Sequence, residues 1–465
     1  MPRVSQESTT AFAYQAVYRY LVELIEAAPA RSEQKLPSLR QLARRLGVSV
    51  STTKYAYALL EDEGRVEARP KFGYFIKVLP GAVLPTGASS LLDQVFANAR
   101  QPGTLALSSD APAMLLSLEN PLWTVERELA RQLPRSLAPQ YLPFGDPELR
   151  AALAERYTQS ADRYWQADDV YIGADLHSVL DLSLDALGLA GTVALVESPC
   201  SWAVLRQLAA AKVRVIELPL DANGCFDLAA LNGLLQQESI RLAVLSSTVN
   251  IPQGGLMPAQ DKQQICRWLA ERDIWLFEND TYGELHFGPP PARYRDFADP
   301  SRLLVFSTFD KVIGAEAPYG YVLCREQAPA LQRLFLERGF RLSPLRQKAI
   351  AKLFTSRRLD VHLKALRSRL WERMNQLKAL LDAHDLWHVQ VPHGGASFWL
   401  QAKRPVDMRQ VFEHLLAQRI VIAPGELFSQ QGAWQQHLRL SFTLDWSKDI
   451  AQAVQQLAQA MRQSP

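Results

Sequence analysis

Short apolar segments alternate with amphipathic helical stretches over most of this chain, from Leu105 onward. The clearest apolar segments lie at 169–172, 193–196, 242–245, 274–277 and 303–306. This alternation is typical of a mostly parallel β-sheet with helices on both faces, so it predicts an α/β fold. Beyond about residue 370, a long helix, strands near 397–400 and 438–442 and a last helix predict a smaller α+β part.

The chain is long enough for two or three domains, since it has 465 residues. A compact segment rich in helix signals covers 11–79. Loop-forming residues rich in proline and glycine then begin what we expect to be a linker over 80–104. The alternating pattern fills 105–465, with a large part at about 140–345 and a small part at about 370–465.

The composition and the apolar runs of the chain indicate in which compartment the protein acts. The net charge of +3 does not by itself indicate a nucleic-acid partner, so any basic surface must be local. We find no signal peptide and no apolar run of about 18 residues, which a membrane span needs. The four cysteines are scattered without metal-ligand spacing, which favours free thiols in a reducing compartment. We therefore expect a cytoplasmic protein without membrane contact.

Two helices joined by a glycine-containing turn are predicted near the N-terminus. Ser38, with Gln41 three residues later, forms a capping box that begins one helix, and Gly47 ends it. Ser49 caps the next helix, over 50–61. This arrangement is the signature of a helix–turn–helix. The second helix begins with small hydroxyl side chains, which suit close approach to bases and phosphates.

The segment that follows the two helices predicts a wing. Residues 64–76 form two short strands with a basic tip that carries Arg69 and Lys71, and a further helix is predicted at 14–27. A winged helix of this kind binds DNA, with its wing near the backbone or the minor groove. The alternative is a small helical interaction domain whose charges are only solvated.

These N-terminal motifs resemble the GntR-type winged helix over about residues 11–78. The shared motifs are Leu-Pro-Ser-x-Arg at 36–40, Leu-Ala-x-x-Leu-Gly-Val-Ser at 42–49 and the Gly-Tyr wing at 73–74. The resemblance implies that the following residues face DNA: Arg40, Ser49, Ser51, Thr52, Lys54, Lys71, Phe72 and Gly73. Val50 stands where the recognition helix often carries arginine, so we expect a different operator sequence.

The rest of the chain resembles fold-type I aminotransferases over about residues 100–463. The matching segments occur in the family's order, at 141–150, 197–199, 252–254, 278–282, 306–311, 423–428 and 438–442. A GntR-type winged helix joined to such a domain is the layout of the MocR subfamily of regulators, in which the chain is identified as a member. The resemblance implies a head-to-tail homodimer and a site for pyridoxal 5'-phosphate.

The resemblance also assigns residues to this cofactor. Pyridoxal phosphate needs a lysine amine, a carboxylate at its pyridine nitrogen, and backbone N–H groups with a cation at its phosphate. The residues that the family pattern places around the cofactor are Lys311, Tyr282, Thr308, Asn279 and Asn250. Arg439 stands where the family binds the carboxylate of a substrate, or here of an effector.

Four positions depart from the family's pattern. Neutral Asn279 replaces the carboxylate that keeps the pyridine nitrogen protonated. Asp280, one residue further along, would point to another face if the segment is a strand. Pro318 replaces the phosphate arginine, and Asp175 brings a negative charge to the phosphate loop in place of glycine. Ile251 stands where asparagine is usual. These changes favour an eroded cofactor site, and whether the cofactor binds stays open.

We therefore expect a sequence-specific DNA-binding transcriptional regulator that is not an enzyme. Its expected partners are a double-stranded DNA operator, a second copy of the chain, and a small effector that is a vitamin B6 vitamer or an amino-acid-like molecule. In a bacterium it would be associated with the nucleoid when bound. The alternatives are a pyridoxal-phosphate-dependent aminotransferase with an accessory DNA-binding domain, and a constitutive DNA-binding dimer whose large domain is only a scaffold.

Overall fold

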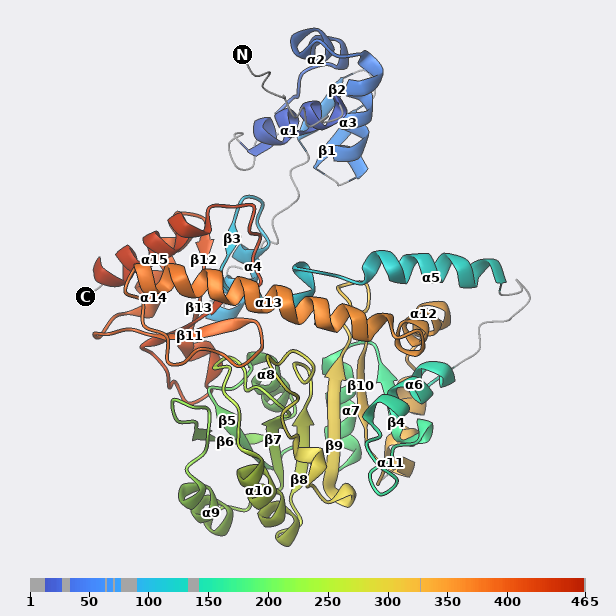
Figure 1. Ribbon diagram of the computed structural model, residues 1–465, viewed down its shortest axis with the longest axis vertical. Helices are drawn as coiled ribbons and strands as arrows, with labels where there is room; N and C mark the ends of the chain where they lie inside the picture. Colours follow the sequence, from blue (N-terminus) through green and yellow to red (C-terminus); the bar gives the residue numbers. More distant parts are fainter. Residues whose placement is uncertain are drawn as a thin grey trace, which may run out of the picture. The chain divides into compact units, whose positions relative to one another are not determined.

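The structure, a computed structural model, describes residues 13–26, 34–62, 65–69, 72–76, 90–132, 142–326 and 328–463. The chain forms two compact units, Met1–Thr104 and Leu105–Pro465. The elements of the first unit are α1 (Ala13–Glu26), α2 (Leu39–Leu46), α3 (Val50–Asp62), β1 (Val66–Arg69), β2 (Gly73–Ile76) and α4 (Leu91–Ala99) (Figure 1).

Capping residues explain the turn between α2 and α3. The Ser38 hydroxyl accepts a hydrogen bond from the Gln41 backbone N–H at 3.3 Å and so begins α2. Gly47 ends α2 with φ of +66°, a left-handed conformation that glycine adopts without steric cost. The Ser49 hydroxyl then accepts from the Thr52 backbone N–H at 3.0 Å at the start of α3. The predicted helix–turn–helix is confirmed.

The wing is an antiparallel pair of strands, β1 and β2, in which Val66 lies opposite Ile76. Tyr57 on α3 ties the wing to the rest of the unit, because its hydroxyl donates to the Pro37 carbonyl at 2.6 Å and its ring stacks on Tyr74 with centroids 4.3 Å apart. The core of the unit is apolar and consists of Val17, Leu21, Leu36, Leu42, Ala56, Tyr57, Leu60 and Val66.

Helix α4 lies inside the segment 80–104, for which the sequence predicts a linker. The Ser90 hydroxyl accepts from the Asp93 backbone N–H at 3.2 Å and begins the helix, and Leu92 and Val95 are buried. A capping residue and an apolar stripe therefore make part of this segment helical. Residues 80–89 lie outside the described residues.

A seven-stranded sheet with the order β4-β10-β9-β8-β7-β5-β6 organises the larger unit (Figure 1). Its strands are β4 (Val170–Gly173), β5 (Val193–Ser198), β6 (Arg214–Pro219), β7 (Leu242–Ser246), β8 (Trp275–Asn279), β9 (Leu303–Thr308) and β10 (Gly320–Leu323). Only the pairs that β10 makes with β4 and β9 are antiparallel. The mostly parallel sheet predicted from the apolar segments is confirmed.

Helices cover both faces of this sheet (Figure 1). On one face, residues of α7 (Leu176–Ala186), α8 (Trp202–Ala210) and α11 (Ala328–Arg338) share a core cluster with Phe277 of β8 and Phe306 of β9. The other face carries α10 (Ala259–Glu271), where the buried Lys262 ammonium donates to the Ser247 carbonyl at 2.5 Å.

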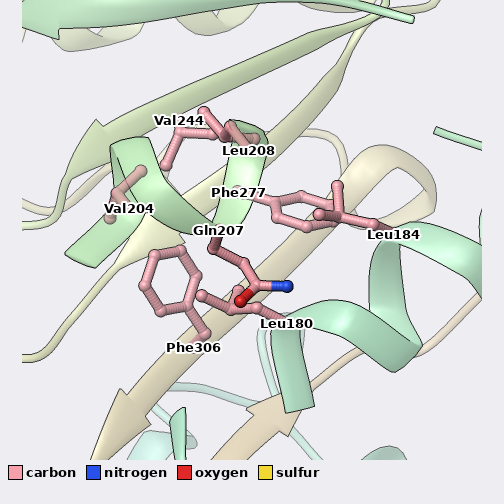
Figure 2. Close-up of a pocket in the computed structure, with 8 residues that line it drawn as sticks. All are labelled: Leu180, Leu184, Val204, Gln207, Leu208, Val244, Phe277 and Phe306. Atoms are coloured by element: carbon pink, nitrogen blue, oxygen red, sulfur yellow. The ribbon is translucent and has the colours of Figure 1, made fainter. Parts of the chain in front are cut away.

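A small pocket lies between the first of these faces and its helices (Figure 2). Its lining residues are Leu180, Leu184, Val204, Gln207, Leu208, Val244, Phe277 and Phe306. Gln207 is polar, and its side-chain oxygen lies 3.3 Å from the Nδ1 atom of His177. The apolar lining indicates a packing space in the core of the sheet rather than a site for a charged ligand.

The small part of this unit carries a three-stranded sheet, β11 (Ser397–Gln401), β14 (His437–Ser441) and β13 (Ala423–Pro424). Its β12 (Ile420–Val421) pairs in parallel with β3 (Leu105–Ala106) at the start of the unit. The remaining helices are α5 (Glu119–Gln132), α6 (Pro147–Tyr157), α9 (Leu228–Gln237), α12 (Pro344–Thr355), α13 (Arg358–Ala383), α14 (Met408–Ala417) and α15 (Ile450–Gln463). The long helix α13 thus begins before residue 370, earlier than the sequence pattern predicts. Among the described residues, no helix combines the length and the apolar character that crossing a membrane requires.

Candidate functional site

The first turn of α3 presents a cluster of hydroxyl groups to solvent. Ser49 and Ser51 are exposed, and the Ser49 hydroxyl lies 2.7 Å from the hydroxyls of both Ser51 and Thr52. Lys54 on the same helix is exposed, as is Arg40 in the first turn of α2. These residues, which we expect to face DNA, are therefore accessible in this unit.

The wing also presents the residues that the sequence singles out. The Phe72 side chain is 66% exposed, and Gly73 has φ of +100°, a conformation that favours glycine at the tight turn between β1 and β2. Lys71 lies outside the described residues. Val50 is 46% exposed, so the residue that replaces the usual arginine still lies on an accessible face of the recognition helix.

In the larger unit, the carboxylate of Asp110 brings three of the predicted site residues together. It accepts a hydrogen bond from the Tyr282 hydroxyl and lies 3.5 Å from the Lys311 ammonium and 3.4 Å from the Arg439 guanidinium. The Lys311 ammonium also donates to the Asp110 backbone carbonyl at 2.7 Å. We call Tyr282, Lys311 and Arg439 the anion site, because all three groups point at one carboxylate.

Arg439 is the most deeply buried member of the anion site. Its side chain is 2% exposed and its guanidinium donates to the Ser108 carbonyl at 2.5 Å. The Trp202 and Phe428 rings lie 4.3 Å and 5.3 Å from the guanidinium carbon, where cation–π attraction favours the charge. Burial lowers the pKa of Arg439 although Asp110 opposes this effect, and a guanidinium stays charged at neutral pH.

The charge of Asp110 depends on the same contacts. Burial acts to raise its pKa, but the positive charges of Lys311 and Arg439 and their hydrogen bonds outweigh burial, so the pKa of Asp110 lies below its ordinary value. Asp110 is therefore ionised at neutral pH. The anion site thus holds one internal carboxylate between two cations.

Alternation along β8 separates Asn279 from the two carboxylates beside it. Glu278 and Asp280 face one side of the sheet, where Arg295 lies 3.0 Å from Glu278 and 3.2 Å from Asp280. Tyr157 also donates to Asp280 at 2.6 Å. Asn279 projects to the opposite side, so Asp280 cannot replace the carboxylate that the family has at Asn279. The prediction that Asp280 points to another face holds in the structure.

The side-chain oxygen of Asn279 is already satisfied. It accepts hydrogen bonds from the backbone N–H and the hydroxyl of Thr281, at 3.2 Å and 2.7 Å. The amide N–H group that remains is a donor, and a donor stabilises the unprotonated form of a pyridine nitrogen. This residue therefore does not supply what a pyridinium ring needs.

The N-terminus of α7, where the family binds phosphate, carries its own carboxylate. Asp175 accepts from the Ser178 backbone N–H at 2.7 Å and also from the Ser178 hydroxyl. It therefore occupies one of the donors that would otherwise attract an anion to this helix end. Pro318, at the arginine position, is exposed and carries no charge. The residues present do not fit pyridoxal phosphate in the way that catalysis would require.

Two of the predicted cofactor residues are engaged elsewhere. Asn250 donates to the Gly224 carbonyl at 3.1 Å and accepts from the Gly255 backbone N–H at 2.9 Å, so its amide joins its own loop to the turn that contains Gly224. Asn250 therefore does not belong to the anion site. The Thr308 hydroxyl contacts Asp310 at 2.8 Å and the Tyr319 carbonyl at 3.2 Å, so it too is satisfied internally.

Asp110 is the residue at this candidate site that sequence reasoning misses. Its contacts reach residues that are 172 positions away, at Tyr282, and further along the chain, and no local pattern marks such a contact. The family often has an aromatic ring at the position of Ser201, where this chain has none. The fold places the Trp202 ring against Arg439.

Models of known protein families match both units of the chain. The family model described as "Bacterial regulatory proteins, gntR family" matches residues 13–76, and that described as "Aminotransferase class I and II" matches residues 119–457. The chain is 30% identical to "Uncharacterized HTH-type transcriptional regulator YdcR" of Escherichia coli (strain K12), over 97% of this chain and 99% of that protein.

Two further proteins are similar over most of the chain. "Probable rhizopine catabolism regulatory protein MocR" of Rhizobium meliloti is 24% identical, over 84% of this chain and 81% of that protein. The solved multiple substrate aminotransferase of Thermococcus profundus shares the fold, with a TM-score of 0.71 and 20% identity over 81% of this chain and 96% of that chain. The chain therefore belongs to the MocR subfamily of GntR-type transcriptional regulators, with a winged helix joined to an aminotransferase class I and II domain.

Proposed function

We propose that the protein is a transcriptional regulator that binds an operator through its winged helix and senses a small carboxylate-bearing molecule in its aminotransferase-like domain. The observation that carries this proposal is the contrast between the two units. The winged helix exposes most of its expected DNA-contacting residues that the structure describes, whereas the anion site lacks the partners that pyridoxal phosphate chemistry needs.

The DNA-binding part of the proposal follows from charge and geometry. Exposed Lys54 and Arg40 can contact phosphates, and the hydroxyls of Ser49 and Ser51 can donate to phosphate oxygens or base edges. Contacts with phosphates fix the position of the helix, and contacts with base edges give specificity. We infer that the protein acts in the cytoplasm as a homodimer, which would place two winged helices on two half-sites.

The larger unit supports ligand binding better than catalysis. Arg439 and Lys311 supply two cations, and Tyr282 supplies a hydroxyl, which together suit a carboxylate. Asn279 and Asp175 do not supply the charges that an efficient electron sink and a phosphate cradle require. An amino-acid-like effector therefore suits this domain better than a substrate that must be converted.

The experiment that tests this function uses the full chain. An operator is selected from a random DNA library, and its affinity is then measured by fluorescence anisotropy with a panel of amino acids, keto acids and vitamin B6 vitamers. We expect at least one carboxylate to change operator affinity by about 5- to 150-fold, which is the usual range of coupling between sites. Unchanged affinity across the whole panel would leave a constitutive DNA-binding dimer as the better account.

A second function, aminotransferase activity, is favoured by one observation: Lys311 and Arg439 are both retained and lie around the same carboxylate. The test is a half-reaction with an amino-acid panel at saturating pyridoxal phosphate, followed by absorbance. We expect no conversion. An absorbance band that depends on Lys311 and changes on adding an amino acid would instead establish catalysis.

A further inference from the structure

We propose that Asp110 is a built-in ligand of the anion site, and that an effector binds there by displacing the Asp110 carboxylate. The proposal rests on the proposed function, since it names the chemistry by which the larger unit would take its ligand. It assigns to Asp110 a role in specificity, because a ligand must carry an anionic group, such as a carboxylate, to replace the one that Asp110 supplies.

The contacts of Asp110 are those of a ligand rather than of a surface ion pair. One carboxylate contacts a tyrosine hydroxyl, an ammonium and a guanidinium, which come from three separate segments of the unit. The Arg439 side chain is 2% exposed and the Lys311 side chain 17% exposed. Charges so withdrawn from water need an anion to compensate them, and in this conformation Asp110 is that anion.

A second carboxylate cannot join Asp110 at this position. Asp310 already lies 3.8 Å from the Lys311 ammonium, so the surroundings of the two cations hold two negative charges. A ligand carboxylate placed beside Asp110 would meet like charge at short range in a poorly solvated space. A ligand carboxylate can therefore bind to Arg439 only when Asp110 has left, and the two carboxylates compete.

The backbone around Asp110 allows such an exchange. Before it, the segment is anchored by hydrogen bonds from the Ser108 N–H to the Val421 carbonyl at 3.0 Å and from the Ser441 N–H to the Leu107 carbonyl at 2.9 Å. After it, the Ala111 N–H donates to the Thr443 hydroxyl at 3.4 Å, which is a long and therefore weak hydrogen bond. The Lys311 ammonium also holds the Asp110 backbone carbonyl at 2.7 Å, so the exchange needs only a rotation of the Asp110 side chain out of the anion site, while the backbone stays in place and β3 stays paired.

The consequence for affinity follows from competition. A ligand that binds only when Asp110 has left the anion site has an apparent affinity equal to its intrinsic affinity multiplied by the fraction of molecules in which the site is open. Removing the Asp110 carboxylate should therefore raise the affinity for a simple carboxylate. The gain should disappear when Arg439 is also removed, because the ligand then loses the cation for which the two carboxylates compete.

The test uses the full chain with acetate as the probe and chloride at equal ionic strength as the reference. Thermal unfolding is measured over a series of acetate concentrations for the wild type, Asp110→Ala, and Asp110→Ala combined with Arg439→Gln. The matched control is Asp168→Ala, which removes another aspartate that lies 3.0 Å from an arginine, Arg150, but whose own side chain is 84% exposed.

We expect acetate to stabilise Asp110→Ala at concentrations about tenfold lower than those needed for the wild type, or lower still. The Asp168→Ala control and the double variant should behave like the wild type. A folded Asp110→Ala protein that responds to acetate no more than the wild type would overturn the proposal. Should Asp110→Ala fail to fold, Asp110→Asn is measured against the same criterion, because it keeps the shape of the side chain and removes its charge.

This experiment separates the inference from the proposed function. A gain of acetate binding in Asp110→Ala, together with operator affinity that no ligand changes, would uphold the role of Asp110 and reject ligand sensing. Operator affinity that responds to a carboxylate, together with no gain in Asp110→Ala, would uphold sensing and reject the role of Asp110.

Discussion

Replacing Arg295 by methionine should strongly destabilise the larger unit, because Arg295 compensates two buried carboxylates on and next to β8. Its guanidinium lies 3.0 Å from Glu278 and 3.2 Å from Asp280, and the side chains of all three residues are at most 4% exposed. Burial raises the pKa of Glu278. At Asp280, burial acts in the same direction, but the charges of Arg295 and Arg293, together with side-chain hydrogen bonds, outweigh it and hold the pKa below its ordinary value. Arg295→Met would leave this pair without its cation.

The size of the effect follows from burial. Removing one partner of a buried ion pair typically costs about 3–5 kcal/mol, because an uncompensated charge stays in the interior. The surface pair of Arg302 with Asp273, where the aspartate side chain is 65% exposed, provides the control. Arg302→Met should change the free energy of unfolding by no more than about 1 kcal/mol.

Urea unfolding followed by tryptophan fluorescence measures both changes, since Trp275 lies on β8 itself. Adding Glu278→Gln to Arg295→Met should recover part of the lost stability, because it removes one uncompensated carboxylate. If Arg295→Met is as stable as Arg302→Met, the charge of Arg295 does not compensate the two buried carboxylates, and this account of the Glu278–Arg295–Asp280 cluster fails.

Three further predictions concern single side chains. Burial lowers the pKa of His437 from 6.5 to about 4, so the unfolded chain binds a proton at a higher pH than the folded protein does. The free energy of unfolding should therefore fall by about 3 kcal/mol as the pH is lowered from 6.5 to 4. His437→Phe should remove this part of the pH dependence, and an unchanged pH dependence would contradict the prediction. Tyr57→Phe removes the donor to the Pro37 carbonyl and should cost about 1–2 kcal/mol, seen as faster hydrogen exchange in α2 and α3, whereas unchanged exchange would show that the bond contributes little. Lys54→Ala should lower the slope of log affinity against log salt by about 0.9 if Lys54 neutralises one phosphate, and an unchanged slope would place it away from the DNA backbone.

The sequence predicts most of the fold because the signals that define it are local. Ser38 and Gly47 mark the ends of α2 through capping, and the segment 193–196 marks β5 through its apolar run. The period of two along a strand likewise predicts that Asn279 and Asp280 face opposite sides of the sheet. Helix α4 carries the same kind of signal, with Ser90 three residues ahead of Asp93, but the loop-like stretch that precedes it favours a linker.

The site is less predictable because long-range packing determines it. Nothing in the residues near Asp110 indicates that its carboxylate meets Lys311 and Arg439, which follow it by about 200 positions or more. Asn250 shows the opposite case, since a residue of the expected type lies near the expected position, but its amide bonds the backbone of Gly224 and Gly255 and not the anion site. Family patterns identify which residues are retained, whereas only the fold shows what those residues contact.

The measurement that tests the central claim most directly is the operator affinity of the full chain and of its Arg40→Ala, Lys54→Ala double variant. DNA is first selected from a random library with the wild-type protein. We predict that one sequence is enriched and that the double variant binds it at least about tenfold more weakly, with each lost contact weakening binding. Selection that enriches no sequence, or equal affinity of the two proteins, would contradict the conclusion that this winged helix binds DNA through the exposed face of α2 and α3.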